Sequence, residues 1–247
     1  MATQLRAFVD TPRPELGAEV TLSESDSRHA LSSLRLSIGD TIIVIDKTSG
    51  RIFEAEIIQS ANKAIVRLTK ETTQTQATSK LGGIIFGLSK GEKNDLVVEK
   101  ATELGAESIV LFQSTQSVVR IDDASSAKKK IERWSKIAEA AAQQSKRSSV
   151  PRIILALTDR ELLTAIETHS SAENLKLLCS LLPGAAPIGL NKIKDSTWVA
   201  VGPEGDFSSA EQSLLISNGF KPVTLGENTL RAETAAIVAM AVVINSI

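Results

Sequence analysis

Beyond about residue 80, the sequence alternates between short apolar runs and longer stretches whose apolar residues recur at helical spacing. The runs have the length and composition of strands buried on both faces, and the stretch 125–146 has the periodicity of a long helix. This alternation over about 165 residues predicts an α/β fold with a parallel sheet covered by helices on both faces. The expected strands are 82–89, 108–114, 152–157, 174–182, 197–202 and 221–226.

The first seventy residues have a different character. "LRAFVD" (5–10), "TIIVID" (41–46), "RIFEAEIIQS" (51–60) and "AIVRLT" (64–69) are rich in β-branched residues and partly alternating, which predicts a small β domain. A short helix is expected at 25–34. The polar stretch 71–80 has almost no apolar residues and is typical of a linker. We therefore expect two domains, 1–72 and 80–247.

Composition narrows the class of protein. Hydrophobic residues make up 42% of the chain and charged residues 23%, as in ordinary globular proteins. The longest apolar run, 235–244, is too short to cross a bilayer, so no membrane association is expected. The single cysteine, Cys179, allows no intramolecular disulfide and fits a reducing cytoplasm, and its apolar surroundings favour a buried core residue. With two distant histidines, a Cys/His zinc site is not expected; Mg²⁺ bound by carboxylates stays open but has no motif, so no metal is predicted.

Net charge is −1, but positive charge gathers in one part of the chain. Between Arg120 and Arg152 there are nine Lys and Arg residues against four acids. Two interpretations are open: a solvated helix face, or a surface that contacts nucleic-acid phosphates.

Three glycine- or proline-containing loops follow apolar runs of the predicted parallel sheet: "LLPGAAPIG" (181–189), "GPEGDFS" (202–208) and "GENTLRAET" (226–234). Ligands of such sheets bind in the crevice beyond the carboxyl ends of the strands. Each loop alone is typical of a plain turn. Together they predict a ligand site, and none is a dinucleotide fingerprint, a phosphate loop or a nucleophile elbow.

Five longer motifs carry a resemblance to a known family. They are "RHALSSLRLSIGD" (28–40), "KATELG" (100–105), "RWSKIAEAAAQQSKRSSVP" (133–151), "VGPEGDFSSAE" (201–211) and "LGENTLRAETA" (225–235). The chain resembles the bacterial 16S ribosomal RNA uridine-N3-methyltransferases of the SPOUT superfamily. That resemblance implies an N-terminal PUA-like β-barrel, a C-terminal domain with a deep trefoil knot, a homodimer, and S-adenosylmethionine as cofactor.

The resemblance also implies which residues form the site. Arg231 and Glu233 fall on the family's Arg-x-Glu-Thr, at the place where cofactor and substrate base meet. Arg231 would stabilise negative charge on the uridine ring, and either Glu204 or Glu233 would accept the N3 proton if burial raised its pKa. A plain ion pair between Arg231 and Glu233 is the alternative for these two residues. The implied cofactor-binding residues are Leu181, Pro183, Val201, Gly202, Pro203, Glu204, Gly205, Leu225, Gly226, Asn228, Thr229 and Leu230.

The implied substrate is 16S rRNA, expected within the small ribosomal subunit rather than as free RNA. The residues expected to contact it are Arg6, Arg28, Arg35, Lys128, Lys129, Lys130, Arg133 and Arg147. The sequence departs from the family pattern at Asp206, where glycine is usual, at Asn228, where arginine is usual, and at Ser33, where valine is usual. Two other functions are considered: a SPOUT enzyme that methylates a ribose 2′-hydroxyl of tRNA or rRNA, and a non-catalytic RNA-binding assembly factor.

Overall fold

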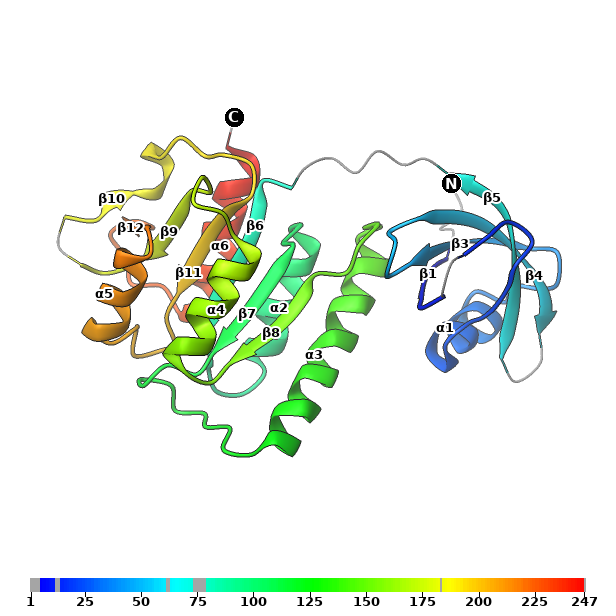
Figure 1. Cartoon of the computed structure of the whole chain (residues 1–247), viewed down its shortest axis with the longest axis horizontal. Helices are drawn as coiled ribbons and strands as arrows, with labels where there is room; N and C mark the ends of the chain where they lie inside the picture. The colour runs from blue at the N-terminus through cyan, green and yellow to red at the C-terminus, as the bar shows by residue number, and fades with distance from the viewer. Residues whose placement is uncertain (1–4, 12–13, 61–62, 73–78, 183, 247) are drawn as a thin grey trace. The chain divides into compact units, whose positions relative to one another are not determined.

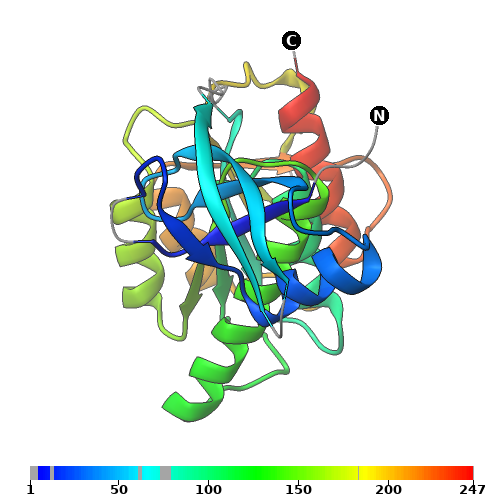
Figure 2. The ribbon, with the colours of Figure 1, turned by 90° about the vertical axis from the view of Figure 1, so that its right-hand side faces the viewer.

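The computed structural model describes residues 5–11, 14–60, 63–72, 79–182 and 184–246 (Figure 1, Figure 2). They form two compact units. The first contains the described residues up to 72 together with Ala142–Val150, and the second contains 79–141 and the described residues from Pro151 onward.

The first unit is built on a five-stranded sheet with the order β1-β3-β4-β5-β2. β1 pairs with β3 in parallel, and the other pairs are antiparallel. The predicted helix at 25–34 is a short α-helix that continues into a π-helical turn. The elements are β1 (Arg6–Val9), β2 (Glu19–Thr21), α1 (Glu24–Arg28), η1 (His29–Ser33), β3 (Thr41–Asp46), β4 (Ile52–Ser60) and β5 (Ala64–Thr72).

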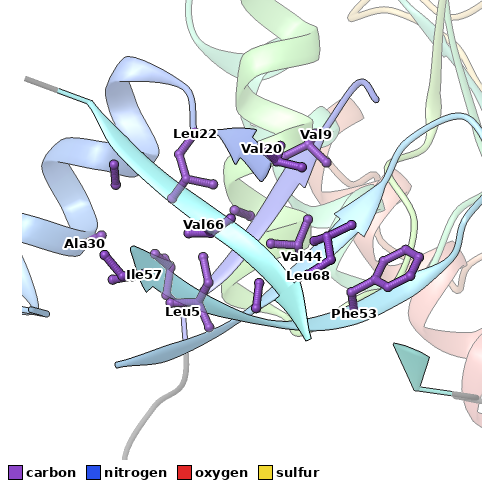
Figure 3. Packing of buried hydrophobic residues seen from close by; sticks show 14 residues of the cluster. Leu5, Val9, Val20, Leu22, Ala30, Val44, Phe53, Ile57, Val66 and Leu68 are labelled. Carbon is purple, nitrogen blue, oxygen red and sulfur yellow. The ribbon is translucent and has the colours of Figure 1, made fainter. Parts of the chain in front are cut away.

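The core of the first unit follows from alternation along the strands. In β5, Ala64, Val66 and Leu68 are buried, and the residues between them are not. The buried side chains gather on the concave side of the sheet, which curls around them, and Leu22 closes the cluster beside α1 (Figure 3). The predicted small N-terminal β fold is confirmed as this curled sheet.

Residues 142–150 pack with the first unit. Ala142 lies in a buried cluster with Phe8, Ile45 and Ile52. The side-chain amide of Gln143 donates a hydrogen bond of 2.8 Å to Asp26 Oδ1. The expected boundaries, 1–72 and 80–247, assign this segment to the second domain, and the packing assigns it to the first.

The second unit is built on a seven-stranded sheet with the order β10-β12-β9-β11-β6-β7-β8, in which every pair is parallel. The predicted α/β fold with a parallel sheet is therefore confirmed, and the trefoil knot stays a prediction of the resemblance. The strands are β6 (Leu81–Gly87), β7 (Ser108–Phe112), β8 (Arg152–Ala156), β9 (Lys176–Cys179), β10 (Ala186–Pro187), β11 (Thr197–Val201) and β12 (Phe220–Thr224).

Helices cover both faces of this sheet. Buried residues of α4 and α5 pack in one cluster with Trp198 and Phe220 of the sheet. On the other face, α6 contacts β6, β11 and α2, and in Figure 1 both α2 and α6 lie behind the strands that α4 crosses. The helices are α2 (Lys93–Glu103), α3 (Ala124–Gln144), α4 (Asp159–His169), the 3-10 turn η2 (Ile188–Leu190), α5 (Ser209–Ser217) and α6 (Ala232–Asn245).

Local signals fixed several helix ends. Thr158 and Ser208 begin α4 and α5 as capping boxes, each with a glutamate three residues on. Gly105 follows α2 with φ 92°, the left-handed conformation that glycine allows at a helix end. β2 and β10 have no counterpart in the sequence-based expectations, because runs of two or three residues carry no readable alternation.

We expect Ala142→Asp to loosen the first unit selectively. The methyl group is fully buried against Phe8, Ile45 and Ile52, and a carboxylate there would lose its hydration without gaining a partner, at a cost of about 3 kcal/mol or more. Amide hydrogen exchange should accelerate in β1 and β3 and stay slow in β6 and β7. Gln144→Asp, exposed at the same helix end, is the matched control. Equal protection of β1 and β3 in both variants would contradict the assignment of this segment.

Candidate functional site

The carboxyl ends of three neighbouring strands lie side by side in the second unit. Cys179, at the end of β9, is opposite Val201 of β11 on one side and Val223 of β12 on the other. The loops that leave these strands enclose a cavity of about 380 Å³. Its lining consists of Lys93, Cys179, Ser180, Leu181, Val201, Gly202, Pro203, Glu204, Asp206, Thr224, Leu225, Gly226, Asn228, Thr229, Leu230, Arg231, Ala232 and Ala235.

The three loops singled out in the sequence therefore meet around one cavity. Among the described residues, every residue expected to bind the cofactor lines it except Gly205, which faces Gln116 instead. Pro183 lies outside the described residues. Of the expected catalytic residues, Glu204 and Arg231 line the cavity, and Glu233 lies beside it in the first turn of α6.

Some residues that line the cavity were not predicted from the sequence as site residues. Ser180 and Thr224 sit where strands pass into the predicted loops, so strand ends could have indicated them. Lys93 comes from the first turn of α2, a distant part of the sequence, and no local signal pointed to it.

The loop 202–208 has a fixed conformation. A Cβ atom on Gly202 would lie 2.6 Å from the Phe207 nitrogen and 2.7 Å from Asp206 Oδ1, so only glycine fits. Asp206 itself adopts a left-handed φ of 62°. Its carboxylate accepts hydrogen bonds from the Phe207 N–H at 2.7 Å and from Gln212 Nε2 at 3.3 Å. These bonds let aspartate occupy a conformation that otherwise favours glycine.

Glu211 anchors the same loop through hydrogen bonds to its carboxylate. Its side chain is buried and accepts hydrogen bonds from Ser114 Oγ at 2.8 Å, from the Thr115 N–H at 2.7 Å and from the Ser208 N–H at 2.8 Å. Burial would raise the pKa of Glu211, but these hydrogen bonds outweigh it and lower the pKa. The buried carboxylate thus joins the start of α5 to the segment after β7.

Two acids and one lysine form a cluster at the cavity. Lys93 Nζ lies 3.0 Å from Glu204 Oε1 and 3.5 Å from Glu233 Oε2. The Lys90 N–H also donates to Glu204 Oε1 at 3.2 Å. The side chain of Glu233 is only 13% exposed, and its Oε2 atom is buried and accepts no hydrogen bond of good geometry, so Lys93 acts on it as a nearby charge.

The protonation of Glu204 follows from this cluster. Burial would raise its pKa, but hydrogen bonds from Lys93 and from the backbone, with the charge of Lys93, lower it below the ordinary value. The pKa of Lys93 is raised, mainly by the hydrogen bond to Glu204. The condition set for Glu204 as a proton acceptor, a pKa raised by burial, is therefore not met in this structure.

Arg231 is the residue that precedes the first turn of α6, and it is exposed. Within the described part of the chain it forms no salt bridge, and Glu233 pairs with Lys93 instead. The alternative of an ion pair between Arg231 and Glu233 is thus not what the structure contains. Arg231 lines the cavity, and none of the acids that the structure describes forms an ion pair with its guanidinium.

Cys179 lies at the cavity wall as a buried residue. Burial, with a smaller contribution from Asp206, raises the pKa of the thiol to about 12. The thiol is therefore protonated at neutral pH and is not a nucleophile, as its apolar surroundings in the sequence predict. The pKa of Asp206 is itself raised by burial.

The basic residues of the first unit differ in their surroundings. Arg6 is half-buried, burial lowers its pKa, and its Nη1 atom is buried without a hydrogen bond. Arg28 pairs with Glu24 at 3.1 Å on the surface. Arg35 is exposed and has a left-handed φ of 55°. Arg147 is half-buried and lies 3.5 Å from the hydroxyl of Ser149.

Helix α3 carries the other basic residues. Lys128 and Lys129 are exposed, whereas the Lys130 ammonium lies 5.7 Å from the centre of the Trp134 ring. Arg133 forms an ion pair with Asp95, whose other carboxylate oxygen accepts from Trp134 Nε1 at 3.1 Å. Arg133 therefore has a structural partner, which leaves Lys128 and Lys129 as the basic side chains most available to phosphates.

The described residues contain neither a candidate metal site nor a candidate membrane span. No group of three or more His, Cys, Asp or Glu side chains there could hold a metal ion. None of the described helices is long and apolar enough to cross a membrane.

A parallel sheet with a cavity of glycine-containing loops at its carboxyl edge is the architecture of an α/β ligand-binding enzyme. The sequence matches the RNA methyltransferase domain family over residues 78–244 and the RNA methyltransferase PUA domain family over residues 22–69. The chain belongs to this family of RNA methyltransferases, and the resemblance seen in its motifs is confirmed.

Relatives and solved structures agree with this family. The chain is 31% identical to ribosomal RNA small subunit methyltransferase E of Bacillus subtilis, over 96% of this chain and 95% of the relative. A ribosomal RNA small subunit methyltransferase E from Neisseria gonorrhoeae, solved bound to S-adenosyl methionine, superposes with a TM-score of 0.80 at 29% identity, over 96% of this chain and 95% of that one. A methyltransferase from Legionella pneumophila, solved with SAM, gives a TM-score of 0.80 at 26% identity, over 97% and 96% of the two chains.

We expect Gly202→Ala to destabilise the second unit. The added methyl group would meet backbone atoms of Asp206 and Phe207, which cannot move without breaking the loop, and overpacking of this kind costs about 2 kcal/mol or more. The melting temperature should fall by roughly 5 °C or more. Gly189→Ala is the control, since a Cβ there has no neighbour within 4 Å. A Gly202→Ala protein with the melting temperature of the wild type would show that the loop is not fixed as described.

Proposed function

We propose that this chain methylates N3 of a uridine in the RNA of the small ribosomal subunit, with S-adenosylmethionine as methyl donor. The observation that carries the proposal is the cavity at the ends of β9, β11 and β12, where the loops marked by the family motifs converge. The names of the relatives support the class of RNA, and the ligand of the similar structures supports the cofactor.

The cavity suits the proposed cofactor in size and chemistry. Its volume of about 380 Å³ lies within the usual range for small-molecule sites. Leu181, Leu225 and Leu230 offer apolar surface for an adenine ring, and Glu204 contributes a carboxylate that suits a cationic ligand. Gly226, with φ 129° and open space where a Cβ would stand, lets a ligand approach the backbone.

Methylation of N3 forms an N–C bond as the S–C bond of the cofactor's sulfonium breaks, and the N3 proton must leave. N3 is a poor nucleophile until that proton is lost, so the protein has to stabilise the resulting negative charge on the ring. Arg231 fits this role because its guanidinium lines the cavity and has no carboxylate partner among the described residues.

For the proton acceptor, the surroundings of the two candidate acids support a choice between them. Glu204 is held as an anion by hydrogen bonds from Lys93 and from the Lys90 N–H, which lower its pKa and reduce its basicity. Glu233 is farther from Lys93, with its buried Oε2 at 3.5 Å from Nζ and without a hydrogen bond of good geometry, so it is the less strongly bonded of the two carboxylates. We therefore assign proton acceptance to Glu233 and a binding role to Glu204.

Phosphates of the rRNA are proposed to contact the exposed lysines of α3 and, in the first unit, Arg6, Arg28 and Arg35. The proposed substrate is the assembled subunit, and the proposed location is the cytoplasm. The proposed RNA-holding domain is 1–72, with the packed segment 142–150 added to it. The cofactor half is proposed to be the knotted domain.

Two alternatives have distinct outcomes. A ribose 2′-O-methyltransferase would leave 3-methyluridine unchanged in a deletion strain. A non-catalytic assembly factor would not bind the cofactor. Nucleoside mass spectrometry of small-subunit rRNA from a deletion strain, before and after incubation with the purified protein and S-adenosylmethionine, tests the proposal. Loss and return of 3-methyluridine is the expected result, and unchanged 3-methyluridine would reject it.

We also propose a homodimer formed through α6. Several apolar side chains of this helix stay only half-buried in the single chain, namely Ile237, Val238, Ala241, Val242 and Ile244. A second copy would cover them. Light scattering at micromolar concentration should give twice the chain mass of 26.4 kDa. Val242→Asp should reduce the measured mass to that of a single chain. A wild-type mass of one chain would reject the dimer.

We expect Arg231→Ala to reduce the single-turnover rate of methyl transfer roughly 100- to 1,000-fold, the usual effect of losing one preorganised donor. Cofactor affinity and melting temperature should stay near wild type, because Arg231 stabilises charge only as N3 becomes nucleophilic. Arg231→Lys should restore part of the rate, since it supplies charge without the planar fork. A fully active Arg231→Ala protein would remove Arg231 from the mechanism.

A further inference from the structure

Lys93 stands at a position that helix electrostatics disfavour. It is the first residue of α2, where the partial positive charge of the helix N-terminus repels an ammonium group. Its side chain is nevertheless directed into a cluster with Glu204 and Glu233 and lines the cavity. An unfavourable charge that contacts two acids of the proposed site points to a role in that site.

The cluster joins three segments that are distant in sequence. Lys93 begins α2, Glu204 lies in the loop after β11, and Glu233 is in the first turn of α6. The distances from Lys93 Nζ are 3.0 Å to Glu204 and 3.5 Å to Glu233, so one ammonium contacts both carboxylates. Its side chain is 28% exposed, which leaves the contacts only partly screened by water.

Lys93 supplies the positive charge that faces both Glu204 and Glu233. Other titratable or charged groups around the cavity are Asp206, Cys179 and Arg231. Asp206 adds a further acid, the Cys179 thiol is protonated, and Arg231 has no ion pair with either glutamate among the described residues. Both carboxylates lie within 3.5 Å of the same Nζ atom, so without Lys93 two partly buried acids would face each other with no cation between them.

We propose that Lys93 is a positioning residue of the methyl-transfer site, whose ammonium pairs with both Glu204 and Glu233 and ties the loop after β11 to the first turn of α6. This inference rests on the proposed function and adds to it a residue outside the three loops. Lys93 touches neither reacting atom; it acts through the two carboxylates. Methyl transfer should therefore depend on Lys93 most strongly at low pH, where Glu204 loses its charge once the lysine that lowers its pKa is removed.

The test compares Lys93→Met, Lys93→Arg and the control Lys90→Met. Lys90 is exposed and contacts Glu204 only through its backbone N–H among the hydrogen bonds of the described residues, so its side chain is dispensable to the cluster. Single-turnover methylation of small subunits from the deletion strain is measured between about pH 4 and 9, so that the range reaches below the ordinary pKa of a glutamate. In Lys93→Met, the midpoint of the acid limb should move up by about one pH unit, as expected on losing one adjacent cation. Lys93→Arg should bring the midpoint back to the wild-type pH, and Lys90→Met should leave the midpoint unchanged.

A second readout does not depend on activity. Carbon-13 NMR of glutamate carboxyls in the cofactor-free protein follows the titration of Glu204, assigned with Glu204→Gln. Loss of Lys93 should raise the pKa of Glu204, because the hydrogen bond and charge that lower it are removed. An unchanged Glu204 titration, or a rate that falls by the same factor at every pH, would overturn the role of Lys93. Absence of methyl transfer by the wild-type protein would instead reject the proposed function, and the NMR titration would still decide on Lys93.

Discussion

The pairing of β9 between β11 and β12 is the constraint on which the rest of the second unit depends. It brings the ends of three strands that are far apart in the sequence to one edge, with Cys179 level with Val201 and Val223. Every residue of the cavity except Lys93 lies at one of these strand ends, in a loop that leaves it, or at the start of α6. A shift of one residue in this register would turn the inward-facing side chains of a strand to the opposite face and displace the loops.

The loop 202–208 is held by hydrogen bonds in addition to the packing of Phe207 in the core. Buried Glu211 connects the start of α5 with the Ser114 and Thr115 segment, and Asp206 is held in a left-handed conformation by its own carboxylate. A glycine at 206, which the family resemblance leads us to expect, would reach that conformation without help. In this chain the aspartate compensates for its side chain through bonds to Phe207 and Gln212. The departure from the family pattern is thus accommodated by the local backbone, and it adds an acid to the cavity wall.

The sheet and the three loops of the cavity could be predicted from the sequence because their signals are local, whereas the individual cavity residues were implied by the family resemblance. The parallel sheet follows from apolar runs of strand length, and the capping boxes at Thr158 and Ser208 mark helix starts within four residues. Lys93 could not be found in this way, because its partners Glu204 and Glu233 are brought to it only by the sheet order that places β11 beside β6. The domain to which 142–150 belongs could not be predicted either. Ala142 continues the apolar periodicity of α3, and this periodicity does not indicate which of the two cores the residue enters.

The membership of 142–150 in the first unit also affects the order in which the protein can fold during its synthesis. The strands of that unit are complete once residue 72 has left the ribosome, but the cluster around Phe8, Ile45 and Ile52 lacks Ala142 and Val150 until some eighty further residues have been made. At ordinary translation rates this delay is about 4 to 16 s. The nascent β-sheet therefore emerges with an uncovered apolar face, and it closes only after β6, β7 and α3 of the second unit have emerged. Such a chain couples the completion of its first domain to the synthesis of its second.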